Sequence, residues 1–142
     1  MIISAGCSKD DSTDDNNGYV TAVYHLLDEN GHESNVFHHG DGMTFELVIT
    51  NTTNHTLKYL DRNDFIDNAF LAYDTEGQIF NPILSTDFMM RSVIIKPGEQ
   101  YYRQVNWPWN KVPLPAGKYY SPCILNIEEL SIKTYTVDFE IK

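Results

Sequence analysis

Hydrophobic and polar residues alternate along most of the chain after residue 18. The clearest case is the segment MTFELVIT, residues 43–50, in which every second side chain is large and apolar. Residues 119–127 and 134–141 follow the same pattern, although Pro122 predicts a sheet edge or a bulge because proline has no N–H to donate. A period of two is typical of strands that bury one face. We therefore expect half-buried β-strands.

Turn-forming residues separate these segments at short intervals. Pro97 followed by Gly98 favours a type II turn, since proline fixes φ at its first central position and glycine tolerates positive φ at the second. No window keeps a helical period, and STDFMMR (85–91) has room for one helical turn at most. Many short strands with regular turns predict an all-β fold. We expect an immunoglobulin-like antiparallel β-sandwich spanning residues 19–142.

Residues 1–18 have a different character. After Cys7, residues 8–18 contain four aspartates and no large apolar side chain, which predicts a solvated, disordered tether. The segment SAGC (4–7) resembles the lipobox of bacterial lipoproteins, with Ser4 where that family prefers leucine. The acidic tail resembles the export signal of surface lipoproteins from Bacteroides-type bacteria.

This resemblance implies a diacylglycerol on Cys7 and a lipid-anchored protein in the cell envelope or at the cell surface. The alternative is a charged terminus with an incidental cysteine.

Composition and charge narrow the choice of partners. The 142 residues are 42% hydrophobic, which is enough for one folded domain with its own core. The formal net charge is −10 and the basic residues are scattered, so neither nucleic acid nor an anionic membrane surface is an expected partner. No apolar stretch is long enough for a spanning helix. Membrane association is therefore expected only through the lipid on Cys7.

The order of strand and turn motifs over residues 42–127 is similar to that of BsuPI-type proteinase inhibitor domains, which are small immunoglobulin-like sandwiches. The positions that carry this likeness are Asn51, Asp74, Gly77, Pro97, Gly98, Glu99, Trp107, Pro115, Gly117 and Tyr119. That family has a tryptophan after the Asp-x-x-Gly turn, which this chain lacks. Phe80 is the residue nearest to that position. The resemblance implies the fold and, as an alternative function, proteinase inhibition. It assigns no inhibitory residue.

The sequence contains no pattern that predicts catalysis. A nucleophile elbow, a phosphate-binding loop and a dinucleotide fingerprint are all missing. Cys123 falls on the inward face of its strand, where a thiol is inert. We expect no enzyme activity and no cofactor.

Two groups of residues raise the question of a metal site. His38 and His39, with His25 or His32, are more simply explained as solvated loop residues. The segment DRNDFID (61–67) contains Asp61, Asn63, Asp64 and Asp67. It fails the EF-hand pattern because Phe65 occupies a ligand position. We therefore expect no metal.

The segment YYRQVNWPWN (101–110) supplies the candidate binding residues. A tryptophan near a strand end, flanked by amides, suits a sugar ring or an aromatic peptide side chain. Trp107 is the better candidate for the core. The expected ligand-binding residues are Trp109, Tyr102, Asn106 and Asn110.

These features predict an exported, lipid-anchored and non-catalytic binding module for a glycan or an extracellular protein. The alternatives are a BsuPI-like proteinase inhibitor and a structural subunit of a surface assembly.

Overall fold

The computed structural model of the protein describes residues 20–60, 66–67, 70–83, 92–125 and 133–142. In these ranges the secondary structure consists of β-strands and turns, with no helix. The strands are β1 (Val20–Leu27), β2 (Val36–Phe37), β3 (Thr44–Asn51), β4 (Leu57–Leu60), β5 (Ile66–Asp67), β6 (Ala72–Asp74), β7 (Ile79–Phe80), β8 (Ser92–Ile95), β9 (Gln100–Asn106), β10 (Gly117–Leu125) and β11 (Lys133–Ile141). The predicted all-β fold is confirmed.

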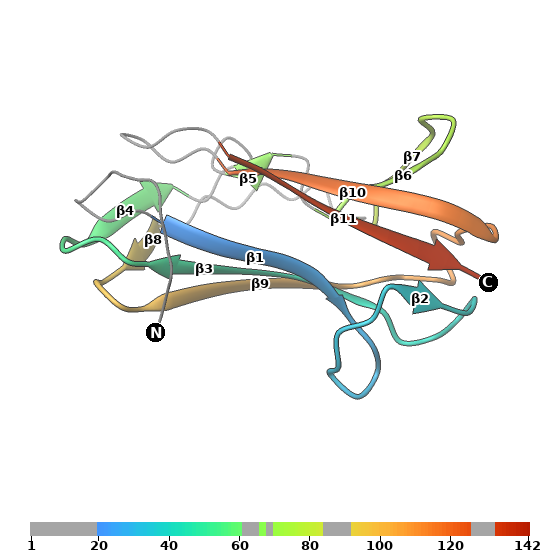
Figure 1. Cartoon of the computed structure of the whole chain (residues 1–142), viewed down its shortest axis with the longest axis horizontal. Helices are drawn as coiled ribbons and strands as arrows, with labels where there is room; N and C mark the ends of the chain where they lie inside the picture. Colours follow the sequence, from blue (N-terminus) through green and yellow to red (C-terminus); the bar gives the residue numbers. More distant parts are fainter. Residues whose placement is uncertain (1–19, 61–65, 68–69, 84–91, 126–132) are drawn as a thin grey trace, which may run out of the picture.

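The strands form two facing layers, as Figure 1 shows. The small sheet has the order β1-β3-β9, and the large sheet has the order β2-β11-β10-β6-β7, with β5 also paired to β10. Strands β4 and β8 pair separately. The described pairings are antiparallel except for that of β2 with β11, which is parallel. The architecture is an antiparallel β-sandwich, whereas the immunoglobulin-like assignment stays a prediction.

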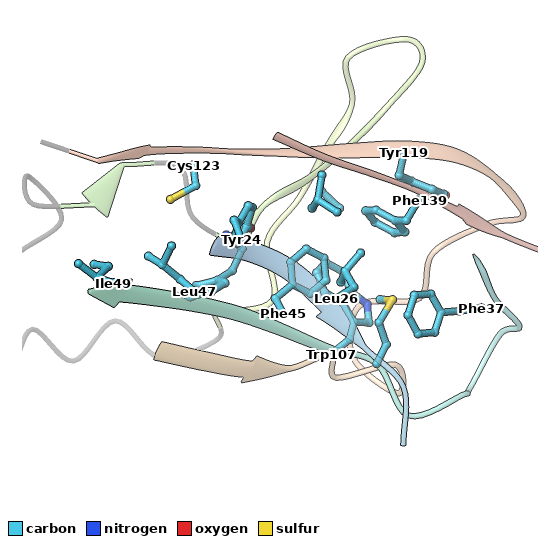
Figure 2. Packing of buried hydrophobic residues seen from close by; sticks show 14 of the residues in the cluster. Tyr24, Leu26, Phe37, Phe45, Leu47, Ile49, Trp107, Tyr119, Cys123 and Phe139 are labelled. Atoms are coloured by element: carbon cyan, nitrogen blue, oxygen red, sulfur yellow. Dashed lines mark hydrogen bonds between the residues drawn. The ribbon is translucent and has the colours of Figure 1, made fainter. Parts of the chain in front are cut away.

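The core lies between the two layers (Figure 2). The predicted alternation places the inward side chains of β3 and β11 here, and all of them except Tyr135 are buried. The ring of Phe45 meets that of Phe139 from the opposite sheet edge-on, with ring centroids 5.7 Å apart. Trp107 is also in the core, 5.4 Å from Phe45. The Phe45–Phe139 contact joins the two sheets, and Trp107 packs beside it from the end of β9, each aromatic side chain burying a large apolar area.

The expectation of a sheet edge or a bulge at Pro122 agrees with the pairing of β10, because the register on the β5–β6 side shifts by two residues across Pro122. Strand β10 pairs with β11 along its whole length, and Pro122 itself faces Thr136 in that register. On its other side β10 pairs with β6 at Tyr119 and Tyr120, and with β5 at Ile124 and Leu125. Pro122 falls between these two short pairings. The sheet therefore accommodates a proline in an interior strand by interrupting the ladder on one side.

The turn between β8 and β9 agrees with its prediction. The N–H of Glu99 donates to the carbonyl of Lys96 at 2.9 Å, which closes a four-residue turn. Gly98 has φ of 83°, as the third residue of a type II turn requires.

Candidate functional site

The four predicted ligand-binding residues lie on two different parts of the surface. Tyr102 and Asn106 both project from the outer face of β9, four strand positions apart, which is about 13 Å. The hydroxyl of Tyr102 donates to Gln100, and the side-chain oxygen of Asn106 accepts from Thr44 Oγ1 at 2.7 Å. Both residues are exposed, and each already has a partner on the sheet.

Trp109 and the exposed Asn110 belong to the turn that follows β9. Trp109 is half-buried and packs against the core. Its Nε1 donates to the carbonyl of Asp41 at 2.7 Å, and its ring lies 5.0 Å from that of His39. Trp109 thus fastens the loop before β3 to the turn after β9.

In the described part of the chain, no group of three or more His, Cys, Asp or Glu side chains is placed so that it could hold a metal ion. Exposed His38 lies 3.5 Å from the carboxylate of Asp41, and His25 Nε2 lies 2.7 Å from Glu46 Oε1. Asp61, Asn63 and Asp64 of the acidic segment fall outside the described residues, as does Cys7.

A groove of about 410 Å³ crosses the outer face of the large sheet. Its floor comes from β10 and β11, one wall comes from the start of β2, and the other includes Thr75 of the β6–β7 hairpin. This volume lies within the range of small-molecule sites. The lining residues are Asn35, Val36, Thr75, Lys118, Tyr119, Tyr120, Asp138, Phe139 and Glu140.

An aromatic pair stands beside this groove. Tyr73 and Tyr120 face each other in the β6–β10 register, and their rings stack with centroids 5.2 Å apart and planes 14° from parallel. Tyr73 covers the β6 side of the Tyr120 ring, so the opposite ring face turns toward β11 and the groove. Tyr120 keeps 39% of its surface exposed. The groove therefore offers one open aromatic face held upright by a second ring.

The polar groups of the groove lie opposite this ring and beyond it. Asp138 faces Tyr120 in the β10–β11 register, and Glu140 faces Lys118 two pairs further along, on the same face of the sheet. Lys142 approaches Glu140 to 4.0 Å. Asp74 also faces Tyr119 in the β6–β10 register, so charged groups of both signs lie at or next to this part of the sheet.

Hydrogen bonds hold both walls in place. On one side, the amide of Asn35 donates to the carbonyl of Asp138, and the N–H of Glu140 donates to the carbonyl of Asn35 at 2.8 Å. On the other, the carboxylate of Asp74 accepts from the N–H groups of Glu76 and Gln78 at 2.8 and 2.9 Å. The hairpin that Asp74 closes projects from the large sheet in Figure 1. The groove is thus preformed.

Tyr119 lies beneath the groove and is buried. Its hydroxyl donates to the carbonyl of Pro115. Burial, followed by the negative charge of Asp74, raises the pKa of Tyr119. The phenol therefore stays protonated and is a structural part of the groove floor.

The sequence analysis did not identify the groove. The alternation of β10 and β11 indicates that Lys118, Tyr120, Asp138 and Glu140 face outward, but it does not tell which outward residues become neighbours. Tyr73 comes from a strand of only three residues. Its pairing with Tyr120 had no signal in the sequence.

Comparison with known proteins adds no family: no protein-family model matches the chain, and no curated protein matches it. Among the described residues, no helix is both long and apolar enough to cross a bilayer.

Proposed function

We propose that this protein is an exported, non-catalytic binding module that is anchored to a membrane through a lipid on Cys7. The observation that carries the binding role is the preformed groove of the large sheet, with the open face of Tyr120 at its side. An exposed aromatic ring in a concave, partly polar site is typical of ligand recognition. This site replaces the surface around Trp109 as our preferred binding region.

The anchoring part of the proposal rests on the sequence of the first 18 residues. SAGC at residues 4–7 resembles a lipobox, and the aspartate-rich residues 8–18 resemble an export signal of surface lipoproteins. Two acyl chains hold a protein on a bilayer because each buried methylene contributes about 0.8 kcal/mol.

Membrane fractionation tests this anchor. The chain is expressed in a Bacteroides-type host behind a complete signal, as the native sequence and as Cys7→Ser. We expect the native form in the membrane fraction and Cys7→Ser in the soluble fraction. Equal partitioning of the two forms would refute lipid anchoring and leave the groove unaffected.

The groove is tested with soluble Cys7→Ser protein as bait. A glycan array and an extracellular extract of the host are each probed with this protein and with a Tyr120→Ala version. If the groove has a binding role, at least one ligand binds the Cys7→Ser protein and does not bind the version that also carries Tyr120→Ala. If no ligand of any class depends on Tyr120, the proposed binding function is wrong.

Proteinase inhibition is a second candidate, and the β6–β7 hairpin favours it. The Asp74 hydrogen bonds make this projecting turn rigid, as a loop that enters a protease cleft must be. Tight inhibition of a subtilisin-type protease that disappears on Asp74→Ala, with no array signal, would promote this function over the first.

A further inference from the structure

We infer that the groove beside Tyr120 binds a neutral oligosaccharide, with one pyranose ring stacked on the open face of Tyr120. This inference rests on the proposed binding function and names its ligand class. Sequence reasoning had placed sugar recognition at Trp109, on a different part of the surface.

The geometry of Tyr120 is the first argument. A pyranose has a face of C–H groups and a rim of hydroxyls, and the negative face of an aromatic ring attracts the C–H side. Tyr73 occupies one face of Tyr120 and fixes the ring upright, which leaves the other face toward the groove. A ring that is already ordered loses little rotamer freedom on binding.

The surroundings of the ring supply the second argument. Asp138 lies across from Tyr120, and Lys118, Glu140 and Thr75 line the same groove. These side chains combine hydrogen-bond donors and acceptors within reach of the hydroxyl rim of a stacked sugar. An aromatic peptide side chain would use the ring and leave most of these polar groups without a new partner.

Charge decides between neutral and ionic ligands. Asp138, Glu140 and the nearby Asp74 are partly offset by Lys118, which lines the groove, and by Lys142, which lies 4.0 Å from Glu140. A sialylated or sulfated glycan would meet these carboxylates and a chain of net charge −10, and a cationic peptide would meet two ammonium groups. A neutral ligand avoids both penalties.

The floor of the groove comes from β10 and β11, and it is bounded by the start of β2 and by Thr75 of the β6–β7 hairpin. An open groove with walls on two sides admits an internal segment of a polymer. The ligand expected from this shape is a chain of several sugars rather than a free monosaccharide.

The test uses soluble full-length Cys7→Ser protein on an array of neutral plant, fungal and host oligosaccharides with their sialylated and sulfated counterparts. The strongest neutral ligand is then titrated by calorimetry. We expect Tyr120→Ala to weaken its affinity about tenfold or more, and Tyr120→Phe to retain it within about threefold, since the phenyl face is preserved. Tyr102→Ala is the matched control, because it removes an exposed tyrosine from the outer face of the other sheet.

Asp138→Asn tests the charge argument in the same titration. We expect a loss of affinity of several-fold, because an amide is a weaker acceptor for sugar hydroxyls than a carboxylate, and little dependence on salt, because a neutral ligand carries no charge to be screened. If Tyr120→Ala removes a peptide or protein from the extract while no neutral glycan binds, this inference fails and the binding function stands. Glycan binding that Trp109→Ala abolishes and Tyr120→Ala leaves intact overturns it too.

Discussion

The hydroxyl of Tyr24 on β1 lies 2.7 Å from Oγ of Ser121 on β10, so a single hydrogen bond crosses the interior from one sheet to the other. The same hydroxyl accepts the backbone N–H of Phe70 at 2.7 Å. All three residues are buried. Burial raises the pKa of Tyr24, an effect that these hydrogen bonds partly offset, so the phenol is neutral at neutral pH.

The first prediction concerns this link. Tyr24→Phe keeps the ring between Phe45 and Phe70 but leaves the buried Ser121 hydroxyl and the Phe70 N–H without their partner. We expect a loss of about 1–3 kcal/mol in the free energy of unfolding, measured by urea denaturation. Tyr102→Phe is the control, since that hydroxyl is at the surface. Equal stability of the two variants would mean that the inter-sheet bond contributes nothing.

The second prediction concerns Asn51, which is fully buried at the end of β3. Its Nδ2 donates to the carbonyls of Ile95 and His55 at 2.8 and 2.9 Å, and its Oδ1 accepts from the N–H of Thr53 at 2.9 Å. Asn51→Ala removes all of these hydrogen bonds, although the His55 carbonyl keeps one from Thr53 Oγ1 at 2.9 Å, so we expect a loss of roughly 3 kcal/mol. Asn54→Ala, at an exposed position three residues later, is expected to change the unfolding free energy by less than about 0.5 kcal/mol.

The third prediction concerns the pH dependence of stability. Glu46 lies on the outer face of the small sheet with its side chain only 12% exposed. Burial alone would raise the pKa of Glu46. Its hydrogen bonds with His25 and Gln104, together with the electrostatic effect of His25, outweigh burial, so the pKa lies below the ordinary value of 4.5. A carboxyl group whose pKa is lower in the folded state stabilises the fold at pH values above its pKa in the unfolded state. This stability is lost as the pH falls through the pKa of the folded state.

We therefore expect Glu46→Gln to destabilise the protein by about 1 kcal/mol at pH 7 and to have a smaller effect near pH 3, measured from urea midpoints. Glu33→Gln serves as the control. Its exposed carboxylate lies 3.9 Å from the other ring nitrogen of His25, and we expect little change at either pH. A constant effect of Glu46→Gln at both pH values would contradict the charge-based explanation.

The fourth prediction separates the two tryptophans. Trp107 is in the core and its Nε1 donates to the carbonyl of Val112 at 2.7 Å, so Trp107→Ala should cost about 3–5 kcal/mol. Trp109 is half-buried and fastens two loops through Asp41, so Trp109→Ala should cost roughly 1–2 kcal/mol. The measurement is urea unfolding followed by circular dichroism. A loss for Trp109→Ala equal to that for Trp107→Ala would place both rings in the core.

Local patterns in the sequence predicted the strands and much of the core. The alternation through Phe45 and Phe139 correctly indicated inward faces, and Pro97–Gly98 correctly indicated its turn. Such features depend on neighbours in the chain, which the sequence displays directly. Pro122 correctly indicated an irregularity in the ladder, but its position in an interior strand depends on the pairing of β10 with β5, β6 and β11, which are distant in the sequence.

The groove depends instead on contacts between distant segments. Tyr73 and Tyr120 become partners only through the register of β6 on β10, and Asn35 reaches Asp138 across more than a hundred residues. Strand order and register are fixed by the packing of the whole core, to which each outward residue contributes little. A search for aromatic residues that cluster within one segment therefore selected residues 101–110. It missed the Tyr73–Tyr120 pair, whose members come from two different strands.

Strand β1 runs from the end of the domain where the first 19 residues enter toward the end that carries the groove. Its first residue, Val20, pairs with Asn51 at one end of the small sheet, while its last, Leu27, leads into the segment that forms the β2 wall of the groove. These ends are about 25 Å apart along the strand. A lipid on Cys7 would hold the domain by the Val20 end, and residues 8–18 extend by at most about 40 Å. Such a tether would leave the groove free to lie away from the bilayer, where a polymer too large to approach the lipid headgroups can still enter it.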